Sequence, residues 1–186
     1  MQLSIAHDLD KLKKSLNTTG EKVFKPSLNA AINKTGTKHM NAAITAVGKV
    51  QRVKRALVKA KVDYSKSNYK TLTFTAEANY KGITWNSLGA KTIGRAKNTK
   101  GVRAGNGANR HIHSHAFIAQ GKYGKQQVFV RDTNARYPLR VLRVRLYETF
   151  NREFKQRIKT AKDDVLTELD KQIEWRVKKE LEKSAN

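Results

Sequence analysis

Apolar residues in the first third of the chain recur at helical intervals. Near the start these are leucines, at Leu3, Leu9, Leu12 and Leu16. Residues 17–20, Asn-Thr-Thr-Gly, offer a natural helix stop, so we expect a short amphipathic helix before them. A second helical stretch is predicted from near Pro26, because proline fits the first turn of a helix.

The apolar residues of this second stretch fall on roughly one side of a helix. They are Leu28, Ala31, Ile32, Ala43, Ile44, Val47, Val50, Leu57 and Val58. Gly36 and Gly48 each weaken a helix by ~1 kcal/mol relative to alanine, so each is a candidate position for a break or a kink.

From residue 71 the pattern changes to an alternation with period two. Residues 71–78, TLTFTAEA, alternate as a half-buried strand does, and GITWNSLGAK, starting at Gly82, indicates a second short strand and its exit. Further strands are predicted at 112–119, 126–131 and 139–145, joined by turns of hairpin length, so we expect an antiparallel meander. Residues 94–110 contain four glycines and many charges, which is typical of a long exposed loop.

The segment 146–186 has no Gly or Pro, and its apolar residues keep a period near 3.6, so it is predicted to be one helix. Such a helix would span roughly 55–60 Å, about twice the diameter of a small domain, and part of its apolar stripe would extend beyond its own core. We expect this part to be covered by oligomerisation or docking. Folding back on the second helix, or fraying at the end, are the alternatives.

These patterns predict an α+β fold in a single domain, 1–186, with one core. The expected parts are a helical part at 1–62, a β-rich part of about five strands at 70–145 that contains the basic loop 94–110, and the long C-terminal helix at 146–186.

The charge is strongly positive and unevenly distributed. The net charge is +24, but ten Lys or Arg against nine Asp or Glu from residue 146 onward leave +23 on the first 145 residues. No acidic residue lies between Glu77 and Asp132, while the basic residues there are Lys81, Lys91, Arg95, Lys97, Lys100, Arg103, Arg110, Lys122, Lys125 and Arg131. Like charges repel within a Debye length of ~8 Å, so an anionic partner is indicated, either a polyanion or an acidic protein face. A basic surface kept for solubility is the alternative.

The absence of cysteine excludes disulfides and thiolate zinc sites and fits assembly in a reducing cytoplasm. No window approaches the ~18 apolar residues that a membrane span needs, and the start lacks the pattern of a signal peptide. We therefore expect a soluble, unprocessed chain that does not bind a membrane.

Three histidines at alternate positions, His111, His113 and His115, raise the question of a metal site. Successive ones on a strand face lie ~6.5–7 Å apart, so two of them could hold one metal and the third could not. The nearest carboxylate is on another element, within a field that repels cations. We interpret the histidines as a polar strand face and expect no metal and no cofactor.

The sequence also gives no sign of an enzyme. Residues 89–96, GAKTIGRA, have the outer spacing of a phosphate-binding P-loop, but Arg95 and Ala96 stand where that motif needs Lys and then Ser or Thr. No nucleophile has a visible base, and no base has an orienting partner. We expect no catalytic residues.

Binding to nucleic acid, if it occurs, is expected to be non-specific. The cations could contact phosphates, but no zinc-finger, RNP-like or basic-zipper pattern is present. Five aromatic residues interleave with the cations and are interpreted as core residues in preference to base-stacking ones: Tyr64, Tyr69, Phe74, Tyr80 and Trp85.

Several short motifs, taken in order, resemble one known family. They are VKRALVKAK (53–61), SLGAK (87–91), HAFIAQ (115–120), VFVRD (128–132) and ARYPLRVLRVRL (135–146), followed by the long helix. This order is similar to that of the bacteriophage minor tail protein Z family, over roughly residues 26–165. The resemblance implies a structural virion protein of a long-tailed phage, made in the host cytoplasm, which completes the head-proximal end of the tail at the neck for head–tail joining and genome passage.

On this reading the protein forms a homo-oligomeric ring or several copies around the tail axis. Its partners would be a tail terminator, a tail tube or a head connector, with possible non-specific contact with phage DNA. The partner-facing or DNA-facing residues are predicted to be Lys91, Arg95, Lys97, Lys100, Arg103 and Arg110. The fold-forming residues are predicted to be Ala116, Phe117, Ile118, Tyr137, Pro138 and Leu139. The alternative function is that of a free, non-specific, histone-like nucleic-acid-binding protein.

Overall fold

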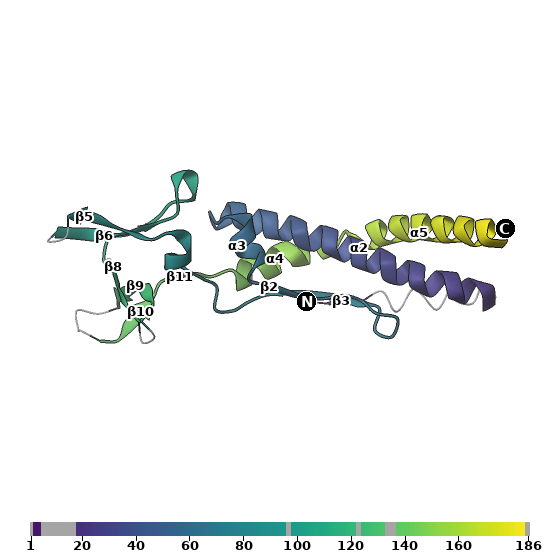
Figure 1. Cartoon of the computed structure of the whole chain (residues 1–186), viewed down its shortest axis with the longest axis horizontal. Helices are drawn as coiled ribbons and strands as arrows, with labels where there is room; N and C mark the ends of the chain where they lie inside the picture. The colour runs from purple at the N-terminus through teal and green to yellow at the C-terminus, as the bar shows by residue number, and fades with distance from the viewer. Residues whose placement is uncertain (1, 5–17, 96–97, 122–123, 133–136, 185–186) are drawn as a thin grey trace. The chain divides into compact units, whose positions relative to one another are not determined.

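The computed structural model describes residues 2–4, 18–95, 98–121, 124–132 and 137–184 (Figure 1). It confirms an α+β fold with antiparallel sheets, although the described residues form eleven short strands in four sheets instead of about five strands in one. The chain divides into two compact units. Unit one contains residues 1–43, 63–77 and 151–186, and unit two contains 44–62 and 78–150. Each unit collects separate segments of the chain, and the single domain stays a prediction.

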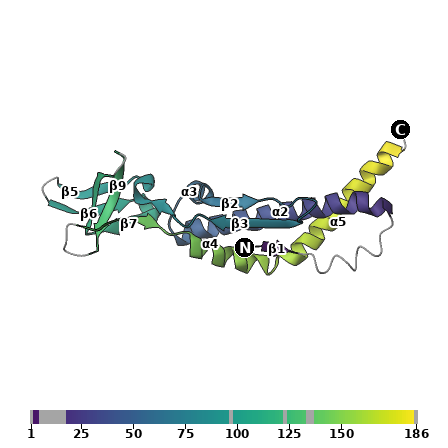
Figure 2. The same ribbon diagram turned by 90° about the horizontal axis from the view of Figure 1, so that it is seen from below.

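In unit one, a three-stranded sheet has the order β1-β3-β2 (Figure 2). The strands are β1 (Gln2–Ser4), β2 (Val62–Ser65) and β3 (Thr73–Ala78), and β1 pairs antiparallel with β3. The predicted N-terminal helix is therefore wrong at residues 2–4, and its remainder lies outside the described residues. Isolated helices shorter than ~12–15 residues are marginal in water, whereas a strand gains the backbone hydrogen bonds of the neighbouring β3.

Helix α2 (Thr18–Val50) begins before Pro26, which lies inside it, and continues through both Gly36 and Gly48 without a break. The predicted start was thus wrong, and Gly36 does not break the helix. The stretch does break shortly after Gly48, because α2 ends at Val50 and α3 (Arg55–Lys59) follows it. At Gly36 the reason is packing: a Cβ atom placed there would lie 2.5 Å from the ring of Phe74. Phe74 is fully buried and stacks on Tyr64 with 6.1 Å between the ring centroids. The absence of a side chain at Gly36 therefore leaves the space in which Phe74 packs, so that β3 can lie close to the helix.

A long C-terminal helix is present, but the structure interrupts the predicted single helix. Helix α4 (Tyr147–Ile158) ends before Lys159, and α5 (Ala161–Ser184) starts after Thr160. The Thr160 hydroxyl donates to the Arg157 carbonyl at 3.0 Å, and two aspartates occupy the first turn of α5. Threonine before a helix and acidic residues in its first turn are start signals, and here they outweigh a continuous apolar period.

Helix α5 lies beside α2 within unit one (Figure 1). Its buried residues are Ala161, Val165 and Leu169. Among the described residues two ion pairs join the two helices, Lys34 with Glu168 at 2.7 Å and Lys38 with Asp164 at 3.0 Å, and His39 Nε2 lies 2.8 Å from the same Asp164 carboxylate. Farther along α5, Trp175 and Val177 are 53% and 43% exposed. The chain therefore covers the predicted apolar stripe at its start and leaves it exposed at Val177.

Unit two contains three small antiparallel sheets. The first joins β4 (Ile83–Thr84) to β11 (Arg143–Val144), and the second is the meander β10-β9-β8, of Leu139–Val141, Gln126–Arg131 and Ala116–Gln120. The third has the order β5-β6-β7, of Lys91–Arg95, Asn98–Ala104 and His111–His113. Three short helical segments complete the unit: α3 (Arg55–Lys59), η1 (Trp85–Leu88) and η2 (Gly107–Asn109).

The predicted loop at 94–110 is largely a hairpin, and the predicted strand 112–119 divides at Ser114 and His115. The loop prediction was wrong because the glycine at Gly101 does not mark a loop. It permits β6 to lie close to the backbone at the end of β7. A Cβ atom at Gly101 would lie 2.2 Å from the His113 carbonyl oxygen. The residue is therefore needed for β6 and the end of β7 to pair this closely.

We predict that Gly36→Ala lowers the free energy of unfolding by ~1–3 kcal/mol, because overpacking against Phe74 outweighs the gain in helix propensity. Urea unfolding followed by circular dichroism measures this. In a Phe74→Leu background the same change should cost less, since the smaller side chain leaves room. An equal loss in both backgrounds would show that the ring is not the cause.

The ion pairs of unit one should make its stability depend on pH. Lys38 lowers the pKa of Asp164, and Lys34 lowers the pKa of Glu168. Their stabilisation is therefore complete above the unfolded value of about 4 and is lost as the pH falls through the lowered pKa. We expect the free energy of unfolding, from urea titrations at neutral and strongly acidic pH, to fall less for Asp164→Asn than for the wild type. The variant should lose on the order of 1 kcal/mol or less at neutral pH, as for other exposed pairs.

Candidate partner interface

Unit two carries most of the charge of the protein. It has twenty Lys or Arg against two acidic residues, Asp132 and Glu148, a net of +18, whereas unit one has nineteen against thirteen. Asp132 accepts hydrogen bonds from Arg140 at 2.9 and 3.0 Å, which raises the pKa of Arg140 above its usual value. Two carboxylates cannot neutralise twenty cations, so unit two presents a strongly positive field to its surroundings.

The sheet β5-β6-β7 places three of the predicted residues on one exposed face. Lys91 lies opposite Arg103, and Arg103 lies opposite Ile112, so these residues form one row across the sheet. Strand β6 has one more residue than β5 between the pairs Thr92–Val102 and Gly94–Thr99, which is a β-bulge. Gly101 and Val102 are both buried at this bulge.

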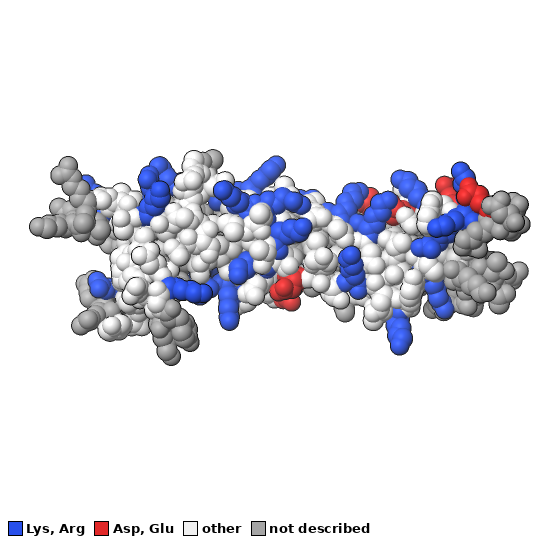
Figure 3. Space-filling view, in the orientation of Figure 1, with Lys and Arg blue, Asp and Glu red and all other residues white. Residues whose placement is uncertain are grey.

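The exposed residues on either side of the bulge are Lys100 and Arg103. We therefore place both on the outer face, together with Lys91, and call these three residues the basic face. On the side drawn in Figure 3, the part formed by β5, β6 and β8 shows Lys and Arg and no Asp or Glu among its described residues. Ile112, 57% exposed, adds an apolar side chain to the row.

The other predicted cations are not all placed. Arg110 is exposed and immediately precedes β7. Arg95 ends β5 opposite Asn98, but its side chain is outside the described part, and so is Lys97. The structure thus brings Lys91, Lys100 and Arg103 together, with Arg110 at the end of the same sheet.

The histidines pack around a buried tryptophan. The rings of His111 and His113 lie 5.7 and 6.5 Å from that of Trp85, which is 8% exposed. His111 Nε2 also lies 3.3 Å from the Arg52 carbonyl oxygen. His115 is in the turn after β7, so the prediction of one strand face with three histidines was wrong. The described residues contain no group of three or more His, Cys, Asp or Glu arranged to hold a metal.

The aromatic residues divide between core and surface. Phe74 and Trp85 are buried as predicted, whereas Tyr64, Tyr69 and Tyr80 are 50%, 62% and 80% exposed, which corrects the core prediction for these three. Tyr80 meets Tyr147 edge to face, with ring centroids 5.6 Å apart.

The predicted fold-forming residues lie in the meander of unit two or beside it. Ala116 is buried, and Phe117 lies opposite Phe129 with 6.1 Å between the ring centroids. Ile118 and Leu139 are half-buried, while Pro138 and Tyr137 are exposed and joined by a cis peptide bond. Their role in forming the fold stays a prediction.

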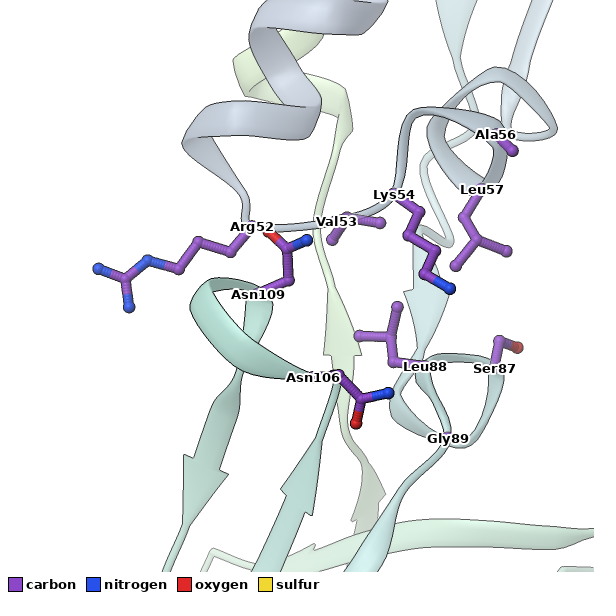
Figure 4. A pocket seen from close by; sticks show the side chains of 11 residues that line it. Arg52, Val53, Lys54, Ala56, Leu57, Ser87, Leu88, Gly89, Asn106 and Asn109 are labelled. Atoms are coloured by element: carbon purple, nitrogen blue, oxygen red, sulfur yellow. The ribbon is translucent and has the colours of Figure 1, made fainter.

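A concave site opens on unit two where the end of α2, the start of α3, η1 and η2 meet (Figure 4). Its volume is about 430 Å³, and no acidic residue lines it. The lining residues are Arg52, Val53, Lys54, Ala56, Leu57, Ser87, Leu88, Gly89, Gly105, Asn106 and Asn109. We call this site the α3 pocket. Lys54 reaches toward Ser87 and Leu88, whereas Arg52 points away from them.

Arg52 holds an unfavourable backbone conformation at the end of α2. Its N–H donates to the Lys49 carbonyl at 3.3 Å, and the Val53 N–H donates to the Gly48 carbonyl at 2.9 Å, which is the Schellman pattern. The residue at this position adopts a left-handed conformation, with φ 51° at Arg52. Glycine is the usual residue there, so an arginine is retained against a conformational cost.

The α3 pocket could not be predicted from the sequence, because its walls come from segments around residues 52–57, 87–89 and 105–109 that only the fold brings together. The one local signal was a helix end without glycine, at VQRV, residues 50–53. That signal marks a strained position, and it does not reveal a cavity.

We predict that Arg52→Gly raises the free energy of unfolding by about 0.5–1 kcal/mol, because the left-handed strain exceeds the extra entropy of glycine in the unfolded chain. Denaturant unfolding measures the change. Arg52→Ala is the matched control, since it keeps the strain and should give no such gain. If Arg52→Ala raised the free energy of unfolding as much as Arg52→Gly, the cause would be the removal of the arginine side chain and not the relief of the left-handed backbone.

Comparison with known proteins gives one family. The family described as Prophage minor tail protein Z (GPZ) matches residues 7–184. The searches of curated proteins and of solved structures give no significant match. No helix in the described part of the chain is both long enough and apolar enough to cross a membrane.

Proposed function

The chain belongs to the prophage minor tail protein Z family, and from this premise we propose that it completes the head-proximal end of a long-tailed phage tail. Membership of the family makes it a structural protein of the phage tail, and therefore a virion component that contacts other tail proteins. The finer role is to join the tail to the head at the neck and to let the genome pass.

The charge of unit two is the observation that supports this role most strongly. A net charge of +18 calls for anionic neighbours, and at a phage neck the genome would be one and an acidic face of an adjacent tail protein would be another. Several copies around the tail axis would repel one another through these units unless such neighbours were present. The basic face is where we place this contact.

The proposal includes the absence of catalysis. The pKa shifts found among the described residues belong to Asp164, Glu168 and Arg140, and each is caused mainly by an ion-pair partner near the surface. Active sites instead combine a shifted pKa with a cleft and an oriented second group. These three residues have the pattern of structural ion pairs.

The charge of unit two also favours the alternative of a free, histone-like protein. That protein would bind duplex DNA tightly as an isolated chain, with log affinity falling against log salt by ~0.9 per phosphate contacted. A tail-completion protein is expected to bind DNA weakly in solution and to act once it is held at a tail end.

We expect the triple variant Lys91→Glu, Lys100→Glu, Arg103→Glu to fold normally and to block head–tail joining. Each of these side chains is exposed, so fold and melting temperature should change little. Complementation of a prophage that lacks the gene should give a titre lower by about a hundredfold or more, since reversed charges on a partner face each cost a large part of the contact energy. Electron microscopy should show separate heads and tails.

The matched control reverses three exposed cations of unit one, Lys66, Lys70 and Lys155. This control should restore normal titres. Infectious particles from the triple variant at wild-type yield would refute the placement of the contact on the basic face. Tight duplex binding by the purified wild type at physiological salt, together with normal joining, would favour the histone-like protein.

A further inference from the structure

We propose that the α3 pocket binds an acidic peptide segment of a neighbouring tail protein, with one apolar side chain of that segment inserted among Val53, Leu57 and Leu88. The inference rests on the proposed function, since it takes the partner from the same assembly. It assigns to unit two a second contact, separate in its lining residues from the basic face.

The pocket combines charge with an apolar floor. Lys54 extends over it toward Leu88, and Arg52 stands at its rim (Figure 4). The floor is provided by Val53, 3% exposed, and by the half-buried Leu57 and Leu88. Because the lining has cations and no acid, an occupant with carboxylates would supply the missing charge, and an occupant with an apolar side chain would cover the floor.

The polar rim of the pocket suits a peptide. Asn106 and Asn109 line it and can both donate and accept hydrogen bonds, and so can Ser87, whose hydroxyl also bonds to that of Thr84 at 2.9 Å. A peptide backbone presents both N–H and C=O groups and needs both kinds of partner. A phosphodiester backbone presents acceptors only, so the amide and hydroxyl oxygens would be left unused.

The walls of the pocket are held in place before any ligand arrives. The Gly105 N–H donates to the Leu88 carbonyl at 2.9 Å, and the Asn109 N–H donates to the Asn106 carbonyl at 3.1 Å. A Cβ atom at Gly105 would lie 2.0 Å from the Asn109 carbonyl oxygen, so the glycine is required for this approach. A preformed site loses less entropy on binding.

The size of the pocket also favours a peptide over a duplex. Pockets for compact ligands measure ~300–1,000 Å³, so about 430 Å³ accommodates one or two side chains with their backbone. A DNA duplex presents a convex, evenly charged surface, for which a flat array of cations such as the basic face is the better match.

The strain at Arg52 is an independent indication that this rim has a role. Its left-handed backbone would be relieved by glycine, yet the position carries a long cation next to the pocket. The helix end requires the left-handed backbone but not the arginine, and non-glycine residues held in such a conformation are often found at binding sites. Because the Arg52 side chain points away from Ser87 and Leu88, its cation would meet a carboxylate of the peptide outside the pocket, beyond the rim (Figure 4).

The test uses the purified full-length chain and fluorescence anisotropy. The probe is a fluorescein-labelled peptide that alternates Asp with Leu, and its two controls replace every Asp by Asn or every Leu by Ser. We expect the probe to bind about tenfold or more tightly than either control, because charge and apolar contact both contribute.

The variants separate the pocket from general attraction. Lys54→Glu should weaken probe binding by about tenfold or more, and Arg52→Gly should weaken it by about threefold while the protein stays at least as stable. Lys59→Glu is the matched control, because Lys59 is an exposed cation at the other end of α3, whose N-cap residue is Lys54, and it does not line the pocket. It should change the affinity by less than about twofold.

Four results would overturn the inference. The first is an equal loss of affinity for the probe peptide in Lys54→Glu and Lys59→Glu. The second is that the control peptide with Ser in place of Leu binds as tightly as the probe. The third is a larger effect of Lys54→Glu than of Lys59→Glu on binding of a short DNA duplex, which would assign the pocket to nucleic acid. The fourth is loss of self-association in Lys54→Glu, which would make a second copy of this chain the occupant.

Complementation distinguishes this inference from the proposed function. If Lys54→Glu loses the probe and lowers the titre, the pocket takes part in assembly. If Lys54→Glu no longer binds the probe but still supports normal head–tail joining, the inference fails while the role of the basic face stands. If the basic-face variant joins heads normally while the probe still binds the pocket, the proposed placement on the basic face fails by itself.

Discussion

The repulsion among the cations of unit two is the constraint on which the rest of the structure depends. Twenty cations and two carboxylates share this unit, so the sheets must turn apolar faces inward and carry the charge outward. Val102 and Ala104 are fully buried on β6, and the exposed Arg103 lies between them. Lys100 is also exposed and lies on the other side of the β-bulge. Unit one, with nineteen cations and thirteen acids, instead pairs its charges internally between α2 and α5. Unit one thus balances most of its charge within its own chain and keeps a net charge of +6, whereas the +18 of unit two calls for neighbours.

Two glycines of this chain permit close packing between segments that are distant in the sequence. Gly36 receives the Phe74 ring and Gly101 receives the backbone at the end of β7. In the sequence alone, glycine in a helical pattern indicates a break and glycine among charges indicates a loop, and both predictions failed at these positions. The contact that explains each glycine comes from a residue far away in the chain, so no local window contains it.

Much of the fold could nonetheless be predicted from local patterns. The strands at 71–78 and 126–131 and the long C-terminal helix follow from period and turn spacing, and the structure confirms them. The predicted meander of about five strands is confirmed only for β8, β9 and β10. The cations of the basic face were also named from sequence, since an interval without acidic residues is visible directly. What escaped prediction was the pairing of the 94–110 segment, the helix start at Ala161 and the α3 pocket. The first and the last of these depend on which distant segments meet.

On our proposals, unit two recognises its partners through two surfaces with different roles, the basic face and the α3 pocket. A row of cations attracts any polyanion. It increases the association rate and orients the partner, but it discriminates little between different anionic partners. A concave site with an apolar floor discriminates, because an occupant must match shape as well as charge. The long-range attraction of +18 would bring an acidic partner to unit two, and the pocket would then select among acidic partners. Arg52 holds a left-handed position beside that pocket, where glycine would cost less backbone stability, and on our proposal its cation then lies next to the bound peptide.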